Sequence, residues 1–294
     1  MKAARLHELG GVPTIDEIPA PAGPGLVRVA SVALNPIDIS VANGRFYGGT
    51  PPLPYVIGSE AIGTTEDGRR VWVRGRQLLA EVVDPGSAWV FDVPEGVDDA
   101  TALGCGIAGV TAWLALIWRT QVKSDDTVLV LGASGTLGAV AVQAAKVLGA
   151  RHVIGAARRT EGVPAAADEV VDLSEGGELP SASLIVDALW GEPLERALAA
   201  AQVGVRVVHL GQSAGPSATL LSAWVRGRTA TILGHSLFDI PADAADAGYR
   251  ELCVHARAGR IEIETETFPL DRIDEAWGRQ ASGSPGAKIV VALR

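Results

Sequence analysis

The sequence is poor in the residues that mark several specialised classes of protein. It has 2 cysteines in 294 residues, too few for a framework of several disulfides or for a structural zinc site of four cysteines. Acidic residues outnumber basic ones, and the net charge of −9 disfavours nucleic acid or an anionic membrane as a partner. The first residues hold no apolar core of the length a signal peptide needs. Together with the scarce cysteine, this predicts a cytoplasmic protein.

Long uncharged apolar runs are also scarce, with one exception. Ala100–Trp118 carries no charged residue and approaches the length of a membrane-spanning helix. It contains Gly104, Gly106 and Gly109, however, and no second run accompanies it. We therefore predict a buried helix that lines the junction of two domains, in a protein that does not contact a membrane. The apolar share of 48% and the length of the chain suffice for two well-buried domains.

The middle of the chain contains a strand, a glycine turn and a helix in direct succession. Thr127–Leu131 is an apolar run typical of a strand buried on both faces. Apolar residues then recur at helical spacing until Gly149, which ends the helix. Glycines three residues apart allow a tight turn, close approach of the backbone to a pyrophosphate and close helix–strand packing. The residues of this turn, predicted to bind a dinucleotide, are Gly132, Ala133, Ser134, Gly135, Thr136, Leu137 and Gly138.

Further apolar runs follow the glycine turn and alternate with helical patterns such as Glu192–Gln202. The runs lie at residues 152–157, 169–173, 183–189, 205–210 and 229–233. This alternation predicts a parallel, doubly wound sheet, and it favours nucleotide binding over a turn that uses glycine for geometry alone. Ligands of such sheets bind at the carboxyl ends of the strands. The residues expected at two of these ends are Gly211, Gln212, Ser213, Ser236, Leu237 and Phe238.

Two arginines stand at the end of the second strand of this predicted sheet. NAD-specific domains place an acidic residue there to bind the ribose 2′-hydroxyl, whereas this chain has Arg158 and Arg159, and its nearest acid, Glu161, follows them. Guanidinium groups can bind a dianionic 2′-phosphate in a bidentate manner. We therefore predict NADPH as the cofactor. The alternative is that both arginines cap a strand at the surface.

Several motifs outside the glycine turn occur in a characteristic order. They include NPIDI from Asn35, PPLPYVIGSEAIG at Pro51–Gly63, GVTAWLAL at Gly109–Leu116 and GAKIV at Gly286–Val290. With the glycine turn, they resemble the medium-chain dehydrogenase/reductase superfamily over nearly the whole chain. Within that superfamily the resemblance is to the zinc-free, quinone oxidoreductase-like branch.

The resemblance implies an α/β architecture in which a Rossmann domain is inserted into a GroES-like, mostly β catalytic domain. The catalytic domain would comprise residues 1–118, completed by 263–294, and the Rossmann domain 119–262. Cofactor and substrate would meet in the cleft between them. The family also implies a homodimer through the last Rossmann strand, Thr229–Leu233, which carries no charge that discourages edge pairing. The chain departs from the family at Thr64–Trp89, where the usual extra strands are compressed.

Zinc-dependent members of the superfamily carry metal ligands at positions where this chain has other residues. They have a cysteine in the loop that here reads Asn35–Asp38, and a His-Glu pair where this chain has Ser59 and Glu60. Neither replacement supplies a soft ligand. We therefore predict that no metal is bound. Without a Lewis acid, hydride transfer suits a conjugated acceptor that spreads the developing negative charge.

The resemblance assigns roles to three further residues, each with a structural alternative. Tyr47 is the candidate catalytic hydrogen-bond donor in a long, ordered loop expected over residues 35–63, or else an aromatic residue that packs over the domain edge. Asn35 resembles the family asparagine near the nicotinamide, or it forms a turn before proline. Thr111 matches a family residue near the nicotinamide amide, or its hydroxyl bonds back to a helix carbonyl.

We therefore expect an NADPH-dependent, metal-independent enzyme that transfers hydride to a small-molecule quinone or α,β-unsaturated carbonyl. Among enzymes, the alternative is an enoyl reductase that acts on a thioester or biosynthetic intermediate. From another class, the alternative is a noncatalytic NADPH-binding protein. The compressed region 64–89 and the lack of an assured proton donor keep that alternative open.

Overall fold

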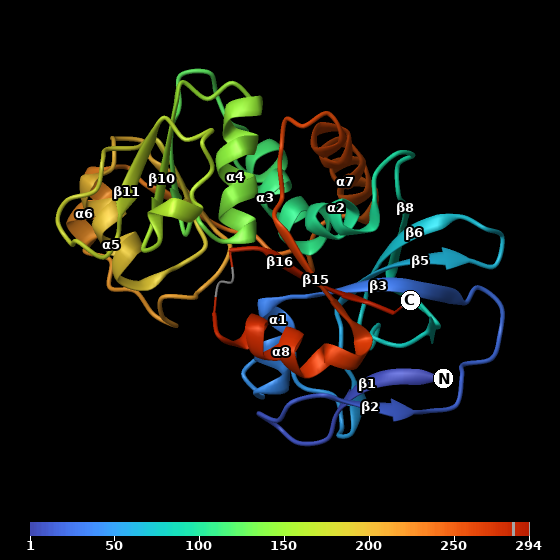
Figure 1. The fold of residues 1–294 in the computed structure, drawn as a ribbon. Coiled ribbons are helices and arrows are strands. Elements are labelled where there is room, and N and C mark those ends of the chain that lie inside the picture. Colours follow the sequence, from blue (N-terminus) through green and yellow to red (C-terminus); the bar gives the residue numbers. More distant parts are fainter. Residues whose placement is uncertain (284–285, 294) are drawn as a thin grey trace. The chain divides into compact units, whose positions relative to one another are not determined.

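The computed structural model describes residues 1–283 and 286–293, and the chain forms two compact units (Figure 1). The first comprises Met1–Ile107, Tyr249–Arg257 and Ile263–Arg294, and the second comprises Ala108–Gly248 and Ala258–Glu262. Antiparallel pairing dominates the first unit, and the second unit contains a parallel sheet. The predicted α/β class, with a mostly β domain and a Rossmann-like domain, is confirmed.

The boundary between the units lies inside the apolar run, whereas the sequence placed it after residue 118. Helix α2 (Asp99–Gly104) leads into the wider turn η1 (Cys105–Val110), where Gly106 leaves the helical conformation with φ −62° and ψ −131°. Helix α3 (Thr111–Leu114) and the turn η2 (Ala115–Arg119) then continue in the second unit. The division follows this backbone break rather than the end of the apolar composition.

The stretch Asp99–Arg119 is long and apolar enough to cross a membrane by length and composition alone. In its most apolar window, 72% is buried inside the protein. Burial of this extent is typical of a core helix and agrees with the predicted buried helix. Its place at a domain junction, and the absence of membrane contact, remain predictions.

The mostly β unit contains a seven-stranded and a three-stranded sheet. The larger sheet runs β15 (Thr265–Pro269), β16 (Lys288–Ala292), β3 (Val27–Leu34), β5 (Glu60–Thr65), β6 (Arg70–Arg74) and β8 (Trp89–Asp92), with β7 (Val82–Val83) also paired to β3. The smaller sheet runs β2 (Thr14–Glu17), β1 (Lys2–Leu6) and β4 (Tyr55–Val56). Ile289 pairs with Leu34 across β16 and β3. This register brings the C-terminal strand beside the segment that follows β3.

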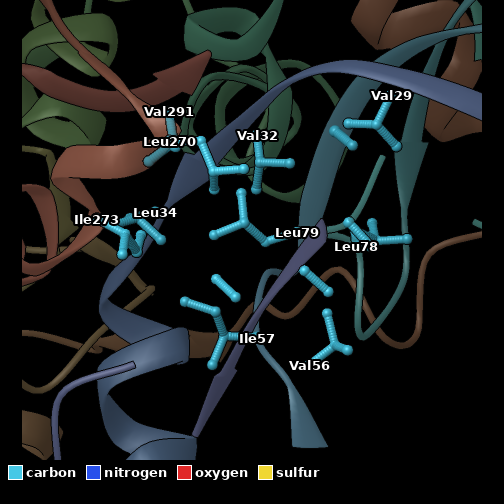
Figure 2. Packing of buried hydrophobic residues seen from close by; sticks show 14 of the residues in the cluster. Val29, Val32, Leu34, Val56, Ile57, Leu78, Leu79, Leu270, Ile273 and Val291 are labelled. Atoms are coloured by element: carbon cyan, nitrogen blue, oxygen red, sulfur yellow. The ribbon is translucent and has the colours of Figure 1, made fainter. Parts of the chain in front are cut away.

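Branched aliphatic side chains fill the core of the mostly β unit (Figure 2). Val29, Val32 and Leu34 all come from β3 and are at most 1% exposed. Strict alternation would place Val29 and Val32 on opposite faces. The pairing of β3 with β5 shifts by one residue between Val29 and Ser31, and this irregularity returns them to the same face. Helix α8 (Ile273–Ala281), after the turn η4 (Leu270–Arg272), adds Ile273 to the same cluster.

The segment expected to be one long loop over residues 35–63 contains regular structure. It forms helix α1 (Pro36–Ala42) and strand β4, and it ends in the first residues of β5. Asn35 precedes a proline at the first helical position, and Asp38 follows in the first turn. Asn, Pro and Asp in this order mark a helix N-terminus, because Pro needs no partner there and Asp favours the positive end of the dipole. One of the prolines that suggested a loop, Pro36, is instead the first residue of helix α1.

The second unit has six parallel strands in the order β11 (Glu169–Asp172), β10 (His152–Ala157), β9 (Thr127–Leu131), β12 (Leu184–Asp187), β13 (Arg206–His209) and β14 (Thr231–Gly234). The predicted strands are all present, with ends that differ by a few residues. The strand order reverses between β9 and β12. Doubly wound sheets bind ligands at such a switch point, beyond the carboxyl ends of the strands.

Helices cover both faces of the parallel sheet (Figure 1). Leu129 and Leu131 of β9 share a buried cluster with Leu194 of α5 (Gly191–Ala200). The alternate residues of β9 point the other way, where α4 (Thr136–Val147) contacts both β9 and β10. The other elements described in this unit are the turn η3 (Thr160–Gly162), α6 (Ser222–Gly227) and the start of α7 (Ala242–Arg257), whose residues from Tyr249 onward belong to the first unit. Burial on both sides explains why the strands of this sheet are continuously apolar.

Candidate functional site

In the parallel unit, the turn between β9 and α4 has a backbone that requires glycine at two positions. Gly132 has φ +84°, and a Cβ atom at Gly138 would lie 2.1 Å from the carbonyl oxygen of Gly132. Gly135 is the N-cap of α4 and has an extended backbone. The first N–H groups of a helix have no partner inside the helix. The start of α4 can therefore bind an anion such as a pyrophosphate at this turn.

The segment that follows β10 lies against the glycine turn. A Cβ atom at Gly162, in η3, would be 3.1 Å from the Cβ atom of Ser134. Arg158 and Arg159 begin this segment at the carboxyl end of β10, and both are exposed. The structure thus brings the two predicted arginines to the side of the glycine turn, where they are accessible to a ligand.

The carboxyl ends of β9, β12 and β13 also meet beside this turn. A Cβ atom at Gly132 would lie 3.0 Å from Leu189 Cδ2, and one at Gly211 would lie 2.9 Å from the carbonyl oxygen of Ala188. The Ser213 hydroxyl donates to the same carbonyl at 3.2 Å. The glycine turn and the segment that contains Gly211, Gln212 and Ser213 therefore both flank residues 188–189. Two regions predicted from separate motifs form one surface.

Asp187 at the end of β12 is fully buried, and it was not among the residues predicted from the sequence. One carboxylate oxygen accepts from the backbone N–H groups of Leu189 and Trp190 at 3.0 and 2.9 Å. The other lies 3.1 Å from Nδ1 of His209. Trp190 has φ +59°, and its ring centroid lies 4.2 Å from that of His209. Asp187 thus stabilises the backbone that follows β12 and links it to the end of β13. An acidic residue at the end of an apolar run was the feature of the sequence that could have predicted this role.

Thr111 and the segment after β14 form a second group of predicted residues. Thr111 is buried at the start of α3, and its backbone lies within reach of His235. Burial lowers the pKa of His235 to about 4, with a further lowering from Arg119 and a partial offset from the Thr111 backbone. The imidazole is therefore neutral at pH 7. The residues that follow are Ser236, which accepts from a backbone N–H at 3.3 Å, Leu237, which is buried, and Phe238, which is 51% exposed.

The mostly β unit has a buried polar cluster that was not predicted from the sequence. We call it the Glu60 cluster, and its members are Asn35, Asp38, Ser59, Glu60, Trp72 and Lys288. Glu60 is 0% and Lys288 3% exposed, and Lys288 Nζ lies 2.6 Å from Glu60 Oε1. Glu60 Oε1 also accepts from Asn35 Nδ2 at 2.9 Å, while Oε2 accepts from Trp72 Nε1 at 2.9 Å and from the Ile107 N–H at 2.7 Å. Both carboxylate oxygens thus have two donors, as a buried charge requires.

The Glu60 cluster depends on the backbone break at Gly106. A Cβ atom at this position would lie 2.0 Å from Glu60 Oε2 and 2.7 Å from Trp72 Nε1. Glycine therefore lets the helical run approach the carboxylate closely enough for the next N–H group to donate to it. The pairing of β16 with β3 supplies Lys288 from the other end of the sequence. Two features of the sequence could have indicated this cluster: a glycine in an apolar run, and a lone lysine at the start of an apolar strand.

Asn35 lies at the centre of the Glu60 cluster and is 2% exposed. Its Oδ1 accepts from Lys288 Nζ, and its Nδ2 donates to Glu60 and to Ser59 Oγ, the latter at 3.3 Å. Both atoms of the side-chain amide thus have partners inside the cluster. The predicted contact of Asn35 with the nicotinamide remains a prediction.

Asp38 and Tyr55 add two titratable groups next to this cluster. Asp38 Oδ2 accepts from the Asn35 N–H at 2.8 Å and lies 3.1 Å from Ser59 Oγ. Burial raises the pKa of Asp38 to about 7, although the hydrogen bonds and the charge of Lys288 partly offset this rise. Burial, and then the charge of Asp38, raise the pKa of Tyr55 to about 12. Among the described residues, the buried Tyr55 hydroxyl has no hydrogen-bond partner.

Tyr47, the predicted catalytic residue, lies in the segment between α1 and β4. It is 83% exposed, and its ring centroid lies 4.6 Å from that of Phe46. This position agrees with an exposed loop. Its role as a hydrogen-bond donor to substrate remains a prediction.

Within residues 1–283 and 286–293, no group of three or more His, Cys, Asp or Glu side chains could hold a metal ion. Cys105 and Cys253 are both buried free thiols. The neighbouring Cys253 and burial raise the pKa of Cys105 well above its ordinary value. The predicted absence of a metal remains a prediction.

Comparison with known proteins shows which proteins this chain resembles. No family model matches the chain. It is 26% identical to human quinone oxidoreductase over 99% of this chain and 98% of that protein. The structure of Thermus thermophilus quinone oxidoreductase, also solved with NADPH, matches over 100% of both chains with a TM-score of 0.84 and 28% identity. These comparisons support the resemblance of the chain to the medium-chain dehydrogenase/reductase superfamily.

Both of these relatives are named quinone oxidoreductases, so the similarity is to the quinone oxidoreductase-like branch of the superfamily. It is also 26% identical to a phenolphthiocerol/phthiocerol polyketide synthase of Mycobacterium tuberculosis, over 100% of this chain but 14% of that protein. The chain thus spans about one seventh of this much longer relative. An NAD-dependent alcohol dehydrogenase structure shares the fold with a TM-score of 0.87 at 22% identity. The fold is therefore common to relatives whose names differ in cofactor and substrate.

Proposed function

We propose that this protein is an NADPH-dependent oxidoreductase that transfers hydride to a quinone or an α,β-unsaturated carbonyl. One observation carries the proposal: two exposed arginines follow β10 in a segment that lies against the glycine turn. A helix N-terminus and two guanidinium groups match the pyrophosphate and the 2′-phosphate of NADPH. The NADPH complex of the Thermus thermophilus relative supports this assignment.

Each part of the parallel unit has a proposed role in holding the cofactor, which supplies the hydride when bound. The glycine turn binds the pyrophosphate through backbone N–H groups, and Arg158 and Arg159 bind the 2′-phosphate. The residues proposed to line the remainder of the cofactor site are Thr111, Gly211, Gln212, Ser213, Ser236, Leu237 and Phe238. Asp187 keeps the β12 end in place through its two backbone hydrogen bonds.

In the mostly β unit, the Glu60 cluster is the proposed place for the reacting oxygen of the acceptor. Asn35 and Ser59 occupy the positions at which the sequence resemblance implies metal ligands in zinc-dependent relatives. We propose that no metal is used here, so the acceptor must spread its developing charge by conjugation. Elemental analysis that finds about one zinc ion per chain, lost together with activity on chelation, would contradict this part of the proposal.

The experiment that tests the function compares cofactors and acceptors on the purified chain. We expect oxidation of NADPH in preference to NADH, with quinones and enones as acceptors and little turnover of simple aldehydes. Tight NADPH binding without turnover of any acceptor would favour a noncatalytic NADPH-binding protein instead. Equal affinity for NADH and NADPH would contradict the role of the two arginines.

A second candidate function follows from the polyketide synthase relative. Because that match covers the whole of this chain, an enoyl reductase that acts on a thioester or another biosynthetic intermediate is the alternative proposal. An enoyl thioester turned over with a much higher kcat/KM than any quinone would favour it.

We also propose that the protein forms a homodimer through β14. This strand is at the edge of the six-stranded sheet, and Ile232 on it is 36% exposed. An uncharged edge strand is available to pair with a second copy. Light scattering at micromolar concentration should give the mass of a dimer, and a monomer would contradict this proposal.

A further inference from the structure

Hydride transfer to a conjugated acceptor has to be completed by a proton. The hydride carries two electrons to the acceptor, whose oxygen then becomes negatively charged and takes up a proton. Most members of the Glu60 cluster are too enclosed to reach a substrate, since Asn35, Asp38 and Lys288 are at most 7% exposed. Ser59 differs because it is only partly buried. The Ser59 hydroxyl, at the rim of the cluster, is therefore the group that a ligand can reach.

Ser59 Oγ has two neighbours inside the cluster. Asn35 Nδ2 donates to it at 3.3 Å, and Asp38 Oδ2 lies 3.1 Å away. When Asp38 is an ionised carboxylate, it can only accept, so the Ser59 proton turns inward to it. When Asp38 is protonated, it can donate to Ser59 Oγ and leave the Ser59 proton free to point outward. The protonation state of Asp38 thus decides whether Ser59 can donate to a ligand.

We propose that Ser59 donates the proton to the oxygen of the acceptor, and that Asp38 acts through Ser59 as a positioning residue that replaces this proton. The proposal rests on the proposed function, because it needs a hydride acceptor at the Glu60 cluster. It assigns the donor role to a residue other than Tyr47, which is 83% exposed.

The proton balance of the step is complete. The acceptor gains one hydride from the cofactor, which is oxidised, and one proton from the Ser59 hydroxyl. Ser59 takes the carboxyl proton of Asp38, so the serine is unchanged and Asp38 becomes a carboxylate. Asp38 then regains a proton from water before the next turnover.

The surroundings of Asp38 favour a carboxyl group that keeps its proton near neutral pH. The charged groups that face it are Lys288 from β16 and Glu60 from β5, and the Tyr55 hydroxyl from β4 is the neighbouring neutral group. Helix α8, which contacts α1, presents buried apolar residues, and its acids are exposed. With burial as the main cause, the pKa of Asp38 is about 7. The carboxyl is therefore partly protonated at the pH at which the chain would work.

The test measures kcat with NADPH and a quinone from pH 5 to 9 for several variants. Wild-type kcat should fall above about pH 7, because ionised Asp38 cannot free the Ser59 proton. Ser59→Ala should lower kcat about 100-fold, within the range for a general acid, with KM for NADPH unchanged. Ser59→Thr, which keeps the hydroxyl, should recover most of the rate. Asp38→Asn should lower kcat and remove the fall above pH 7.

Ser183→Ala is the matched control, because Ser183 Oγ also donates to a carboxylate, that of Asp126 at 2.8 Å, but lies in the parallel unit. It should leave kcat and its pH profile unchanged. If the wild type turns over an acceptor and Ser59→Ala has the same kcat, the role of Ser59 is wrong but the proposed function stands. The same holds if Tyr47→Phe loses kcat 100-fold and Ser59→Ala loses none. A wild-type chain that turns over no acceptor would overturn the proposed function and this donation with it.

Discussion

The candidate site of the parallel unit consists mainly of backbone groups, whereas that of the mostly β unit consists of side chains. In the parallel unit, the surface that suits a cofactor is made largely of backbone: a glycine turn, a helix N-terminus and strand ends, with Asp187 as a buried support. In the mostly β unit, the Glu60 cluster is made of side chains that come from both ends of the first unit's sequence. A backbone turn is specified by a short contiguous motif, whereas a side-chain cluster depends on single residues that are far apart in the sequence. The first kind of site is therefore easier to find in a sequence than the second.

The comparison also shows how each unit tolerates polar groups in its interior. The parallel unit satisfies Asp187 locally, with N–H groups two and three residues away and with His209 from the next strand. The mostly β unit satisfies Glu60 with donors up to 228 residues distant. Because the hydrogen-bond donors to Glu60 are distant in sequence, the Glu60 cluster is sensitive to the fold of the whole unit. Single substitutions in each unit test this difference.

Removing Lys288 should have the largest effect on stability. Lys288→Met leaves the fully buried Glu60 carboxylate without its ion-pair partner, which costs about 3–5 kcal/mol of unfolding free energy. Urea denaturation followed by circular dichroism measures this loss. Glu275→Gln, which breaks an exposed ion pair in the same unit, should leave the midpoint unchanged. A loss no larger than that of the control would mean that the cluster does not depend on its long-range partner.

Asp38→Asn should change how stability depends on pH. The pKa of Asp38 is about 7 in the folded state, against an ordinary value of 3.8. Between those values the unfolded carboxyl ionises while the folded one keeps its proton, so wild-type stability falls as pH rises through this window. Asparagine does not ionise and removes this fall. Between pH 5 and 8, the variant should gain about 3 kcal/mol relative to wild type.

Urea titrations of wild type and Asp38→Asn at pH 5 and pH 8 measure this difference. Asp172→Asn is the control, because hydrogen bonds from Ser174 lower the pKa of that carboxyl instead. Parallel stability profiles of wild type and Asp38→Asn would contradict a raised pKa at Asp38.

Gly138→Ala tests the backbone-built site. The added Cβ atom would lie 2.1 Å from the carbonyl oxygen of Gly132, so the turn must shift, at a cost of about 1–3 kcal/mol. If the turn holds the pyrophosphate, NADPH affinity should fall by about one to two decades, since 1.4 kcal/mol is about tenfold. Gly227→Ala, where nothing lies within 4 Å, is the control in the same unit. Fluorescence titration with NADPH measures both, and equal affinities would remove the turn from the cofactor site.

Arg158→Ala should have the most selective effect. A charge-assisted hydrogen bond contributes about 1.5–3 kcal/mol, so NADPH affinity should fall by about one to two decades. NADH lacks the 2′-phosphate and should bind almost as before, with Arg159→Ala similar or weaker in effect. Titration of each variant with both cofactors separates the two contributions. If both cofactors weaken alike, the arginines serve the fold rather than the phosphate.

Most elements of the parallel unit follow from the local sequence. Thr127–Leu131 and residues 152–157 are strands with the predicted bounds, and Gly149 follows α4 with φ +86°. These elements are local: a strand buried on both faces and a helix end depend on residues that adjoin one another. The glycine turn and the two arginines could be read in the same way, because strand, turn and helix are contiguous.

The Glu60 cluster and the division of the chain into two units depend on contacts between segments that are distant in sequence. Nothing local to Lys288 indicates that its ammonium group meets Asn35 and Glu60, since this depends on how β16 registers with β3. Likewise, Gly106 interrupts the apolar run because a carboxylate from another strand approaches its backbone. A buried charge is stable only where distant partners converge on it. Such convergence is a property of the folded chain, so no single segment of the sequence contains it.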